Sequence, residues 1–188
     1  MSFLRKKRVF ALLFITFLLF LFANSNMLGK WMYPVRYQQH IDASSQTYGV
    51  DRFLIASIIR VESNFRPDRT SPKGAVGLMQ IMPDTAEWIM ELDDVPPPKT
   101  LNLDNPRDNI LIGTRYIKWL LQQYDGNIVK ALAAYNAGPG NVNKWLASGA
   151  WDGTFEQVDR IPFGETRHYI HRVNYYYKKY AQIYKNGW

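Results

Sequence analysis

Hydrophobic residues recur every three or four positions through most of this chain, which is the period of an amphipathic α-helix. No segment shows the strict alternation of apolar and polar residues that a half-buried strand requires. The pattern therefore predicts an all-α protein. The predicted helices cover residues 34–48 (a weak lead-in helix), 51–62, 84–92, 105–124, 128–136, 142–146 and 165–184.

Helix starts are marked by residues whose side chains can accept hydrogen bonds from free backbone amides. Asp51 and Asn127 precede two of the predicted helices, and Asn105 precedes a third that has Pro106 at its first position. Residues 84–87, Asp-Thr-Ala-Glu, resemble a capping box and predict a helix start at Asp84.

The first 29 residues differ from the rest of the chain. Four basic residues at positions 5–8 precede an apolar run over 9–23, as in secretory signals and signal anchors. Fifteen helical residues span about 22 Å, less than the hydrocarbon core of about 30 Å, and extension to Gly29 gives about 31 Å. We expect an uncleaved anchor over 9–29 that leaves the domain on the outer face of the cytoplasmic membrane. Cleavage near Ser25, which would secrete the protein, is the alternative.

The remaining length suits one domain. We divide the chain into a signal segment (1–29), a lead-in segment (30–45) and a single domain (46–185). Pro96, Pro97 and Pro98 force an extended connection. The absence of cysteine excludes disulfides, thiol catalysis and cysteine-based metal sites.

Net charge does not point to a nucleic-acid partner. The chain carries +7, but four of its 23 basic residues lie at positions 5–8, which leaves 19 basic against 16 acidic residues elsewhere. This mild excess is not the clustered basic footprint of a nucleic-acid-binding protein. His168 and His171 lie three apart without an HExxH pattern, so we expect surface residues and no metal site.

Glu62 is the candidate for chemistry. It continues the apolar stripe of Ile55, Ile58 and Ile59 at the i+7 position, so its carboxyl is expected at the edge of the core. Loss of solvation there raises the pKa of a carboxyl, and general-acid cleavage of a glycosidic bond requires a carboxyl protonated near neutral pH. Alternatively, Glu62 pairs with a nearby arginine (Arg60, Arg66 or Arg115) or is solvated at a helix end.

Four ordered blocks surround this glutamate: ESNF at 62–65, GAVGLMQIMP at 74–83, AAYNAG at 133–138 and IPFGETRHYI at 161–170. Together they closely resemble the soluble-lytic-transglycosylase (SLT) type of peptidoglycan-cleaving enzyme, which has a goose-lysozyme-like fold. The resemblance spans about residues 46–184. It departs from the family at the acidic, proline-rich stretch 91–99.

The resemblance implies a role for each matching position. Glu62 matches the single catalytic acid/base, and the following residues match the sugar-binding cleft: Ser71, Gln80, Met82, Tyr135, Glu165 and Tyr169. Structural roles are open for all six. Ser71 could shape its loop, Met82 and Tyr135 could be core, and Glu165 is favoured near a helix start by the helix dipole.

The implied reaction is cleavage of the β-1,4 bond between N-acetylmuramic acid and N-acetylglucosamine in peptidoglycan strands, with formation of 1,6-anhydromuramyl ends. It needs no metal or cofactor. Ordinary glycoside hydrolases use two carboxylates, whereas here only Glu62 combines an apolar setting with a motif. A hydrolytic muramidase that uses Asp68 or Glu165 as its second acid, or a non-catalytic wall-binding module, is the alternative.

Overall fold

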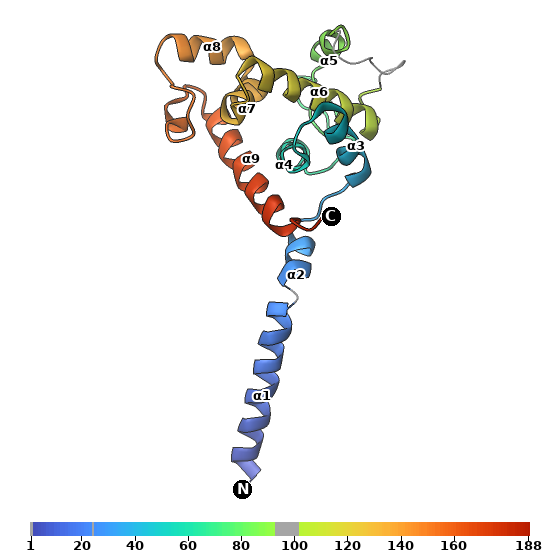
Figure 1. The fold of residues 1–188 in the computed structure, drawn as a ribbon, viewed down its shortest axis with the longest axis vertical. Coiled ribbons are helices and arrows are strands. Elements are labelled where there is room, and N and C mark those ends of the chain that lie inside the picture. The colour runs from blue at the N-terminus through green and yellow to red at the C-terminus, as the bar shows by residue number, and fades with distance from the viewer. Residues whose placement is uncertain (1, 24, 93–101) are drawn as a thin grey trace.

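The computed structural model describes residues 2–23, 25–92 and 102–188, and in this part of the chain every regular element is helical (Figure 1). The all-α prediction is confirmed. The elements are α1 (Ser2–Ala23), α2 (Ser25–Met32), α3 (Gln38–Tyr48), α4 (Arg52–Glu62), α5 (Pro83–Met90), α6 (Pro106–Gln123), α7 (Ile128–Ala137), α8 (Pro139–Ala147), the 3₁₀ turn η1 (Val158–Arg160) and α9 (Gly164–Ile183).

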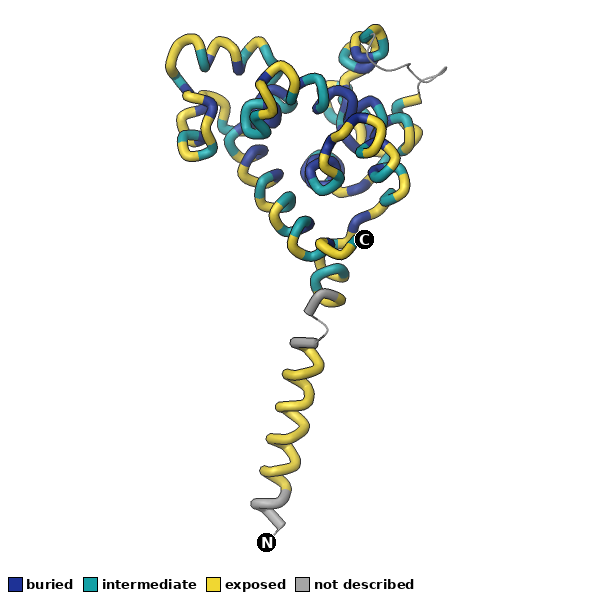
Figure 2. Tube along the Cα trace, viewed as in Figure 1, coloured by how far each residue is buried: buried dark blue, intermediate teal, exposed yellow. Residues whose placement is uncertain are grey.

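Helix α4 is the centre of the domain. Residues 54–59 are all buried, so this helix is covered on every side (Figure 2). Helix α9 makes the most extensive contact with it, and α3 packs on another side (Figure 1). The polar Ser57 fits this environment because its hydroxyl donates to the carbonyl of Leu54 at 2.8 Å. The buried middle of α4 belongs to the core, and the helix carries Glu62 at its C-terminal end.

Three predicted N-caps are confirmed. The Asp51 carboxylate accepts from the amides of Phe53 and Leu54 at 2.7 and 3.2 Å. Asn105 caps α6, with Pro106 at its first position, and Asn127 caps α7 by accepting from the amide of Lys130 at 3.0 Å. These caps satisfy backbone donors that have no partner inside a helix, so they fix where α4, α6 and α7 begin.

The predicted capping box at Asp84 is wrong. Helix α5 begins one residue earlier, at Pro83, and its N-cap is Met82, whose side chain makes no capping hydrogen bond. Proline suits a first helical position because its ring fixes φ and the missing amide would have no partner there. Asp84 therefore lies in the first turn, where its charge still complements the helix dipole.

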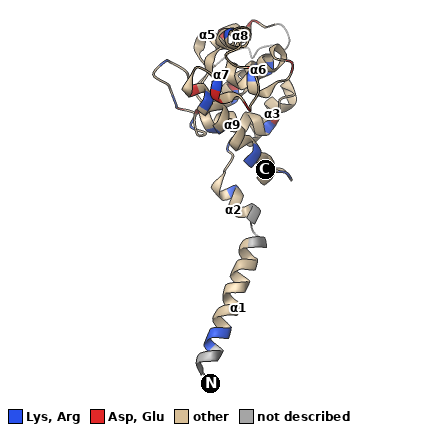
Figure 3. Ribbon diagram, turned by 90° about the vertical axis from the view of Figure 1, so that its left-hand side faces the viewer, with Lys and Arg blue, Asp and Glu red and all other residues tan. Residues whose placement is uncertain are grey.

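The N-terminal segment forms a helix. The described side chains of α1, residues 6–21, are exposed to solvent, and its basic residues lie near its start (Figures 2 and 3). Across the described residues, however, no helix meets the length and apolarity needed to cross a membrane. The predicted transmembrane anchor over 9–29 is therefore not supported by the structure.

Helix α2 is attached to the C-terminal end of α9. The Lys30 ammonium donates to the carbonyl of Gly187 at 3.3 Å and lies 5.2 Å from the centre of the Tyr184 ring. The Tyr184 hydroxyl in turn donates to the carbonyl of Tyr33 at 2.9 Å. These contacts tie the lead-in segment to the domain. The predicted domain limits stay predictions, and the extended connection predicted at residues 96–98 lies outside the described residues.

Candidate active site

Glu62 is the last residue of α4, at the point where the central helix leaves the core. The predicted stripe is confirmed, since Ile55, Ile58 and Ile59 are fully buried. Glu62 itself is only partly buried, so its backbone is anchored in the core while its side chain faces an opening. The position combines a rigid support with access from solvent.

Glu62 forms no ion pair with another described residue, so the predicted alternative of an arginine partner is not observed. Two of the candidate arginines have other contacts. Arg60 lies 5.3 Å from the centre of the Tyr176 ring, and the Arg66 side chain donates to the carbonyl of Ser63 at 3.3 Å. The carboxyl of Glu62 is therefore left for interactions inside the opening.

The loop after α4, residues 63–82, forms one wall of this opening, and Asn109 of α6 holds it in place. The Asn109 side chain accepts from the amide of Met79 at 2.8 Å and donates to the carbonyls of Val76 and Leu103, each at 2.9 Å. Gly77 has a φ of 80°, and a Cβ there would lie 2.2 Å from the Asn109 amide nitrogen. Only glycine allows the loop to approach α6 this closely.

A cleft lies between this loop and helices α7 and α9. Its main cavity has a volume of about 430 Å³. A neighbouring cavity of about 270 Å³ shares Gln80, Met82, Tyr135 and Asn136 with it, so the two form one continuous depression. The main cavity is lined by Glu62, Arg69, Ser71, Pro72, Lys73, Ala75, Gln80, Met82, Tyr135, Asn136 and Glu165.

Burial raises the pKa of Glu62 from 4.5 to about 7, because the surrounding protein disfavours the charged carboxylate. The Tyr169 hydroxyl and the Arg69 charge act in the opposite direction and lower this pKa. The negative charge of Glu165 raises it, and Arg172 lowers it. The raised pKa expected from the sequence is thus confirmed, and Glu62 exists in both protonation states near neutral pH.

Two tyrosines, Tyr135 and Tyr169, lie within interaction range of this carboxyl. The rings of Tyr135 and Tyr169 stack almost in parallel, with centroids 6.4 Å apart. Burial raises the pKa of both hydroxyls well above 10, so both tyrosines stay protonated hydrogen-bond donors. The Tyr135 hydroxyl donates to the carbonyl of Met79 at 2.8 Å.

The Tyr169 hydroxyl is buried and forms no hydrogen bond of ordinary geometry with any described residue. Its effect on the pKa of Glu62 nevertheless places it within interaction range of the carboxyl. A buried hydroxyl without a good partner is uncommon, and here it is a donor available to Glu62 or to a ligand.

Five of the six predicted cleft residues line the same cavity as Glu62: Ser71, Gln80, Met82, Tyr135 and Glu165. Tyr169 does not line this cavity, and its hydroxyl acts on the pKa of Glu62. Met82 is 39% exposed, so it is not the core residue that its type suggests. Glu165 is exposed in the first turn of α9, where the helix dipole also favours it.

Two predicted cleft residues also have structural roles. The Ser71 hydroxyl accepts from the amide of Ala75 at 2.9 Å and so shapes the loop. The Gln80 side-chain amide donates to the carbonyls of Arg69 and Gly77, each at 2.8 Å. Both N–H groups of Gln80 are thus used within the protein, which leaves its side-chain oxygen as the atom that can meet a ligand.

Sequence reasoning missed several cleft residues, among them Arg69, Tyr116 and Asn136. The Asn136 side-chain oxygen accepts from the Thr166 hydroxyl at 2.7 Å, so the N–H groups of this cavity-lining side chain are the atoms left to donate to a ligand. Of these three, only Asn136 had a signal, because it lies inside the AAYNAG block. Arg69 and Tyr116 come from segments whose approach depends on the tertiary fold.

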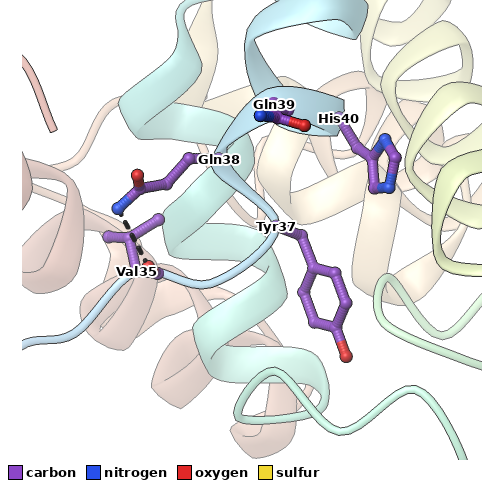
Figure 4. Close-up of a pocket in the computed structure, with 5 residues that line it drawn as sticks. All are labelled: Val35, Tyr37, Gln38, Gln39 and His40. Atoms are coloured by element: carbon purple, nitrogen blue, oxygen red, sulfur yellow. Dashed lines mark hydrogen bonds between the residues drawn. The ribbon is translucent and has the colours of Figure 1, made fainter.

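A separate hollow of about 390 Å³ lies at the start of α3 (Figure 4). It is lined by Val35, Tyr37, Gln38, Gln39 and His40, and it shares no lining residue with the cleft. The Gln38 side chain donates to the carbonyl of Val35 at 3.1 Å. None of these five lining residues carries a carboxylate, so the cleft at Glu62 is the candidate active site.

No group of three or more side chains suited to a metal ion is found among residues 2–23, 25–92 and 102–188. His168 and His171 are exposed, as predicted. The His171 ring lies 3.4 Å from the Asp159 carboxylate.

Comparison with known proteins places this cleft in a family. The family model described as "Transglycosylase SLT domain" matches residues 39–158. The chain belongs to this family. The matched range contains Glu62 and four of the predicted cleft residues, whereas Glu165 and Tyr169 lie beyond its end.

Relatives of this SLT domain are enzymes of larger size. The soluble lytic murein transglycosylase of Salmonella typhimurium is 38% identical over 145 residues, which are 75% of this chain and 22% of that protein. The chain therefore spans about a fifth of the length of this relative.

Solved structures agree with this assignment. The 70 kDa soluble lytic transglycosylase of Escherichia coli superposes with a TM-score of 0.75 and 35% identity, over 82% of this chain and 25% of that one. An inactive glutamate-to-glutamine mutant of the lytic transglycosylase Slt from Pseudomonas aeruginosa gives a TM-score of 0.74 and 34% identity, over 85% and 26%.

Proposed function

We propose that this chain is a peptidoglycan lytic transglycosylase. It would cleave the β-1,4 bond between N-acetylmuramic acid and N-acetylglucosamine and leave 1,6-anhydromuramyl ends. The observation that carries the proposal is a carboxyl with a pKa of about 7, partly buried in a cleft on the last turn of a rigid core helix. A group that titrates near neutral pH can donate a proton and then accept one, which this reaction requires.

Protonated Glu62 acts first as the acid. Its proton passes to the glycosidic oxygen while the bond from that oxygen to C1 of the muramyl residue breaks, and N-acetylglucosamine leaves. Positive charge develops at C1, and the acetamido oxygen of the same sugar stabilises it. This assistance comes from the substrate, so the protein needs no nucleophilic carboxylate of its own.

Ionised Glu62 acts next as the base. It takes the proton of the C6 hydroxyl, whose oxygen bonds to C1 and closes the 1,6-anhydro ring, and Glu62 returns to its protonated form. No water is consumed. An intramolecular attack has a high effective concentration, so it competes with water if the ring is held over the cleft.

Other cleft residues act on Glu62 or on the sugar. The Arg69 charge limits the rise in the pKa of Glu62, which keeps the carboxylate accessible as a base. The side-chain oxygen of Gln80 and the N–H groups of Asn136 supply an acceptor and donors suited to acetamido and hydroxyl groups. The exposed Met82 offers an apolar surface to a sugar ring.

A relative supports the assignment of Glu62. The Pseudomonas aeruginosa enzyme described above is inactive as a glutamate-to-glutamine mutant. Glu62 is the glutamate of this cleft with the raised pKa, and the same replacement is proposed to abolish cleavage here.

A hydrolytic muramidase is the second candidate, because Glu165 lines the same cavity as Glu62 and raises its pKa. In that reaction Glu165 would activate a water molecule, and the products would have reducing ends. Asp68, the other carboxyl considered from the sequence, does not line the cavity. A wall-binding module without activity is less favoured, since a pure binder gains nothing from a carboxyl whose burial is costly.

Residues 1–29 are proposed to direct export, so that the domain acts on peptidoglycan from the outer face of the cytoplasmic membrane. The support is the sequence order of a basic flank and an apolar run. Mature protein that starts at Met1 would favour attachment through 9–29, and a new N-terminus near Ser25 would indicate secretion. N-terminal sequencing of the exported protein distinguishes the two.

The experiment that tests the activity compares three variants of the full chain on purified peptidoglycan. We expect Glu62→Gln to abolish release of soluble fragments while the variant still sediments with the wall. Glu156→Gln, at an exposed acid outside the cleft, serves as the matched control. Glu165→Gln should retain most activity. Clearance by Glu62→Gln at the normal rate would refute the acid/base assignment, and loss of activity in Glu165→Gln equal to that in Glu62→Gln would favour the hydrolase.

A further inference from the structure

Aromatic side chains continue from the cleft along helices α5 and α6. The Tyr116 ring lies 5.2 Å from that of Tyr135, and the Trp119 ring lies 6.4 Å from that of Tyr116 at an angle of 14°. Trp88 of α5 contacts both, with its ring 6.3 Å from Tyr116 and 4.7 Å from Trp119, nearly perpendicular to each. We refer to Trp88 and Trp119 as the tryptophan pair.

Helical spacing places this pair beside the smaller cavity of the cleft. Thr85 of α5 and Tyr116 of α6 line that cavity. Trp88 and Trp119 each follow one of these residues by three positions, so each lies on the same face of its helix. The tryptophan pair thus lies about one helical turn beyond residues that line the cavity, although neither tryptophan lines it.

The tryptophan pair is rigid and still open to solvent. Trp88 is 38% exposed although it contacts two other rings, and Trp119 is partly buried. A single exposed tryptophan is ordinary on a protein surface. Here two indoles on different helices pack edge to face. They lie next to a cleft that, under the proposed function, binds a polymer. Such a pair is suited to bind a further part of that polymer.

We propose that the tryptophan pair binds a further saccharide unit of the glycan strand, beyond the units held in the cleft. This inference rests on the proposed function. A pyranose ring has an apolar face of C–H bonds that packs against an indole, and the rigid pair loses little side-chain entropy when it binds.

The position of the pair predicts a dependence on strand length. A short oligosaccharide fills the cleft at Glu62 without reaching the tryptophan pair, whereas a longer one passes Tyr116 and reaches it. Affinity should therefore rise at the length that spans this distance. One aromatic contact is worth about 0.5–1.5 kcal/mol, so removal of Trp88 should weaken binding of long strands by about two- to tenfold.

The test measures binding by the full chain in a Glu62→Gln background, so that no strand is cleaved. The probes are peptide-free strands of alternating N-acetylglucosamine and N-acetylmuramic acid, from two to eight units. Trp88→Ala and Trp119→Phe are compared with Trp31→Ala. Trp31 is 78% exposed on α2, at the opposite end of the domain from α5 (Figure 1), so its removal controls for the loss of an exposed indole.

The expected result is a gain in affinity with length that Trp88→Ala removes, that Trp119→Phe reduces and that Trp31→Ala leaves intact. Equal binding of the shortest bound strand by all variants shows that the cleft is folded in each. If Trp88→Ala retains the full gain with length, the tryptophan pair is not a binding site although the proposed function stands. If no strand of any length binds, both the proposed function and this inference are wrong.

Discussion

The buried carboxyl of Glu62 makes a prediction about stability that does not depend on activity. Its pKa is about 7 in the folded chain and 4.5 in a solvated one. Protonation therefore favours the folded state. This stabilisation is complete below pH 4.5, declines as the pH rises and is lost once the pH passes about 7.

The magnitude follows from the difference between the two pKa values. At about 1.4 kcal/mol per pH unit, the change from 4.5 to about 7 corresponds to about 3 kcal/mol of unfolding free energy. Glu62→Gln cannot ionise. The unfolding free energy of the variant minus that of the native chain should therefore rise by about 3 kcal/mol from pH 4 to pH 8. Nearly all of this rise should occur between pH 4.5 and 7.

The assay is urea unfolding of both proteins at several pH values from 4 to 8.5, followed by circular dichroism. Other titrating groups contribute equally to the two proteins, so the difference between their unfolding free energies isolates Glu62. Glu156→Gln, at an exposed acid, should show no such gain. A difference between Glu62→Gln and the native chain that stays constant across this pH range would refute the raised pKa, and with it the argument for a neutral-pH acid.

Two further predictions test the surroundings of Glu62. Tyr169→Phe removes a hydroxyl that lowers the pKa of Glu62, so the fall in cleavage rate at high pH should move to higher pH. If the rate falls at the same pH as in the native chain, the hydroxyl does not act on the carboxyl. Gly113→Ala places a Cβ 2.5 Å from the Met79 sulfur and should destabilise the chain by about 1–3 kcal/mol in urea unfolding. Gly140→Ala, where a Cβ meets nothing within 4 Å, is the control and should stabilise α8 slightly, and equal effects of the two would contradict the packing argument.

The helices and their caps could be predicted because they depend on local chemistry. Asp51 and Asn127 accept hydrogen bonds from the amides just after them, and such contacts need no tertiary structure. The predicted start of α5 was wrong by one residue because the sequence contains two start signals there. One is the capping box at Asp84, and the other is a proline at the first helical position. The structure adopts the proline start.

Glu62 could be predicted because it continues the helical stripe of Ile55, Ile58 and Ile59 to the edge of the core. The residues that tune it could not be predicted in this way. Arg69 reaches the cleft through a loop whose path is set by Asn109, thirty or more positions from the backbone groups that it binds in that loop. Pairing over such distances leaves no periodic signal in a sequence. For the same reason the pairing of Trp88 with Trp119 emerges only when α5 packs on α6.

The measurement that tests the central claim most directly is mass spectrometry of the fragments that the full chain releases from purified peptidoglycan. A lytic transglycosylase closes the 1,6-anhydro ring without adding water, so its fragments should be lighter by one water than fragments with reducing ends. They should be absent with Glu62→Gln. Fragments with reducing ends would contradict the account and identify a hydrolase, with Glu165 as the carboxyl to test next.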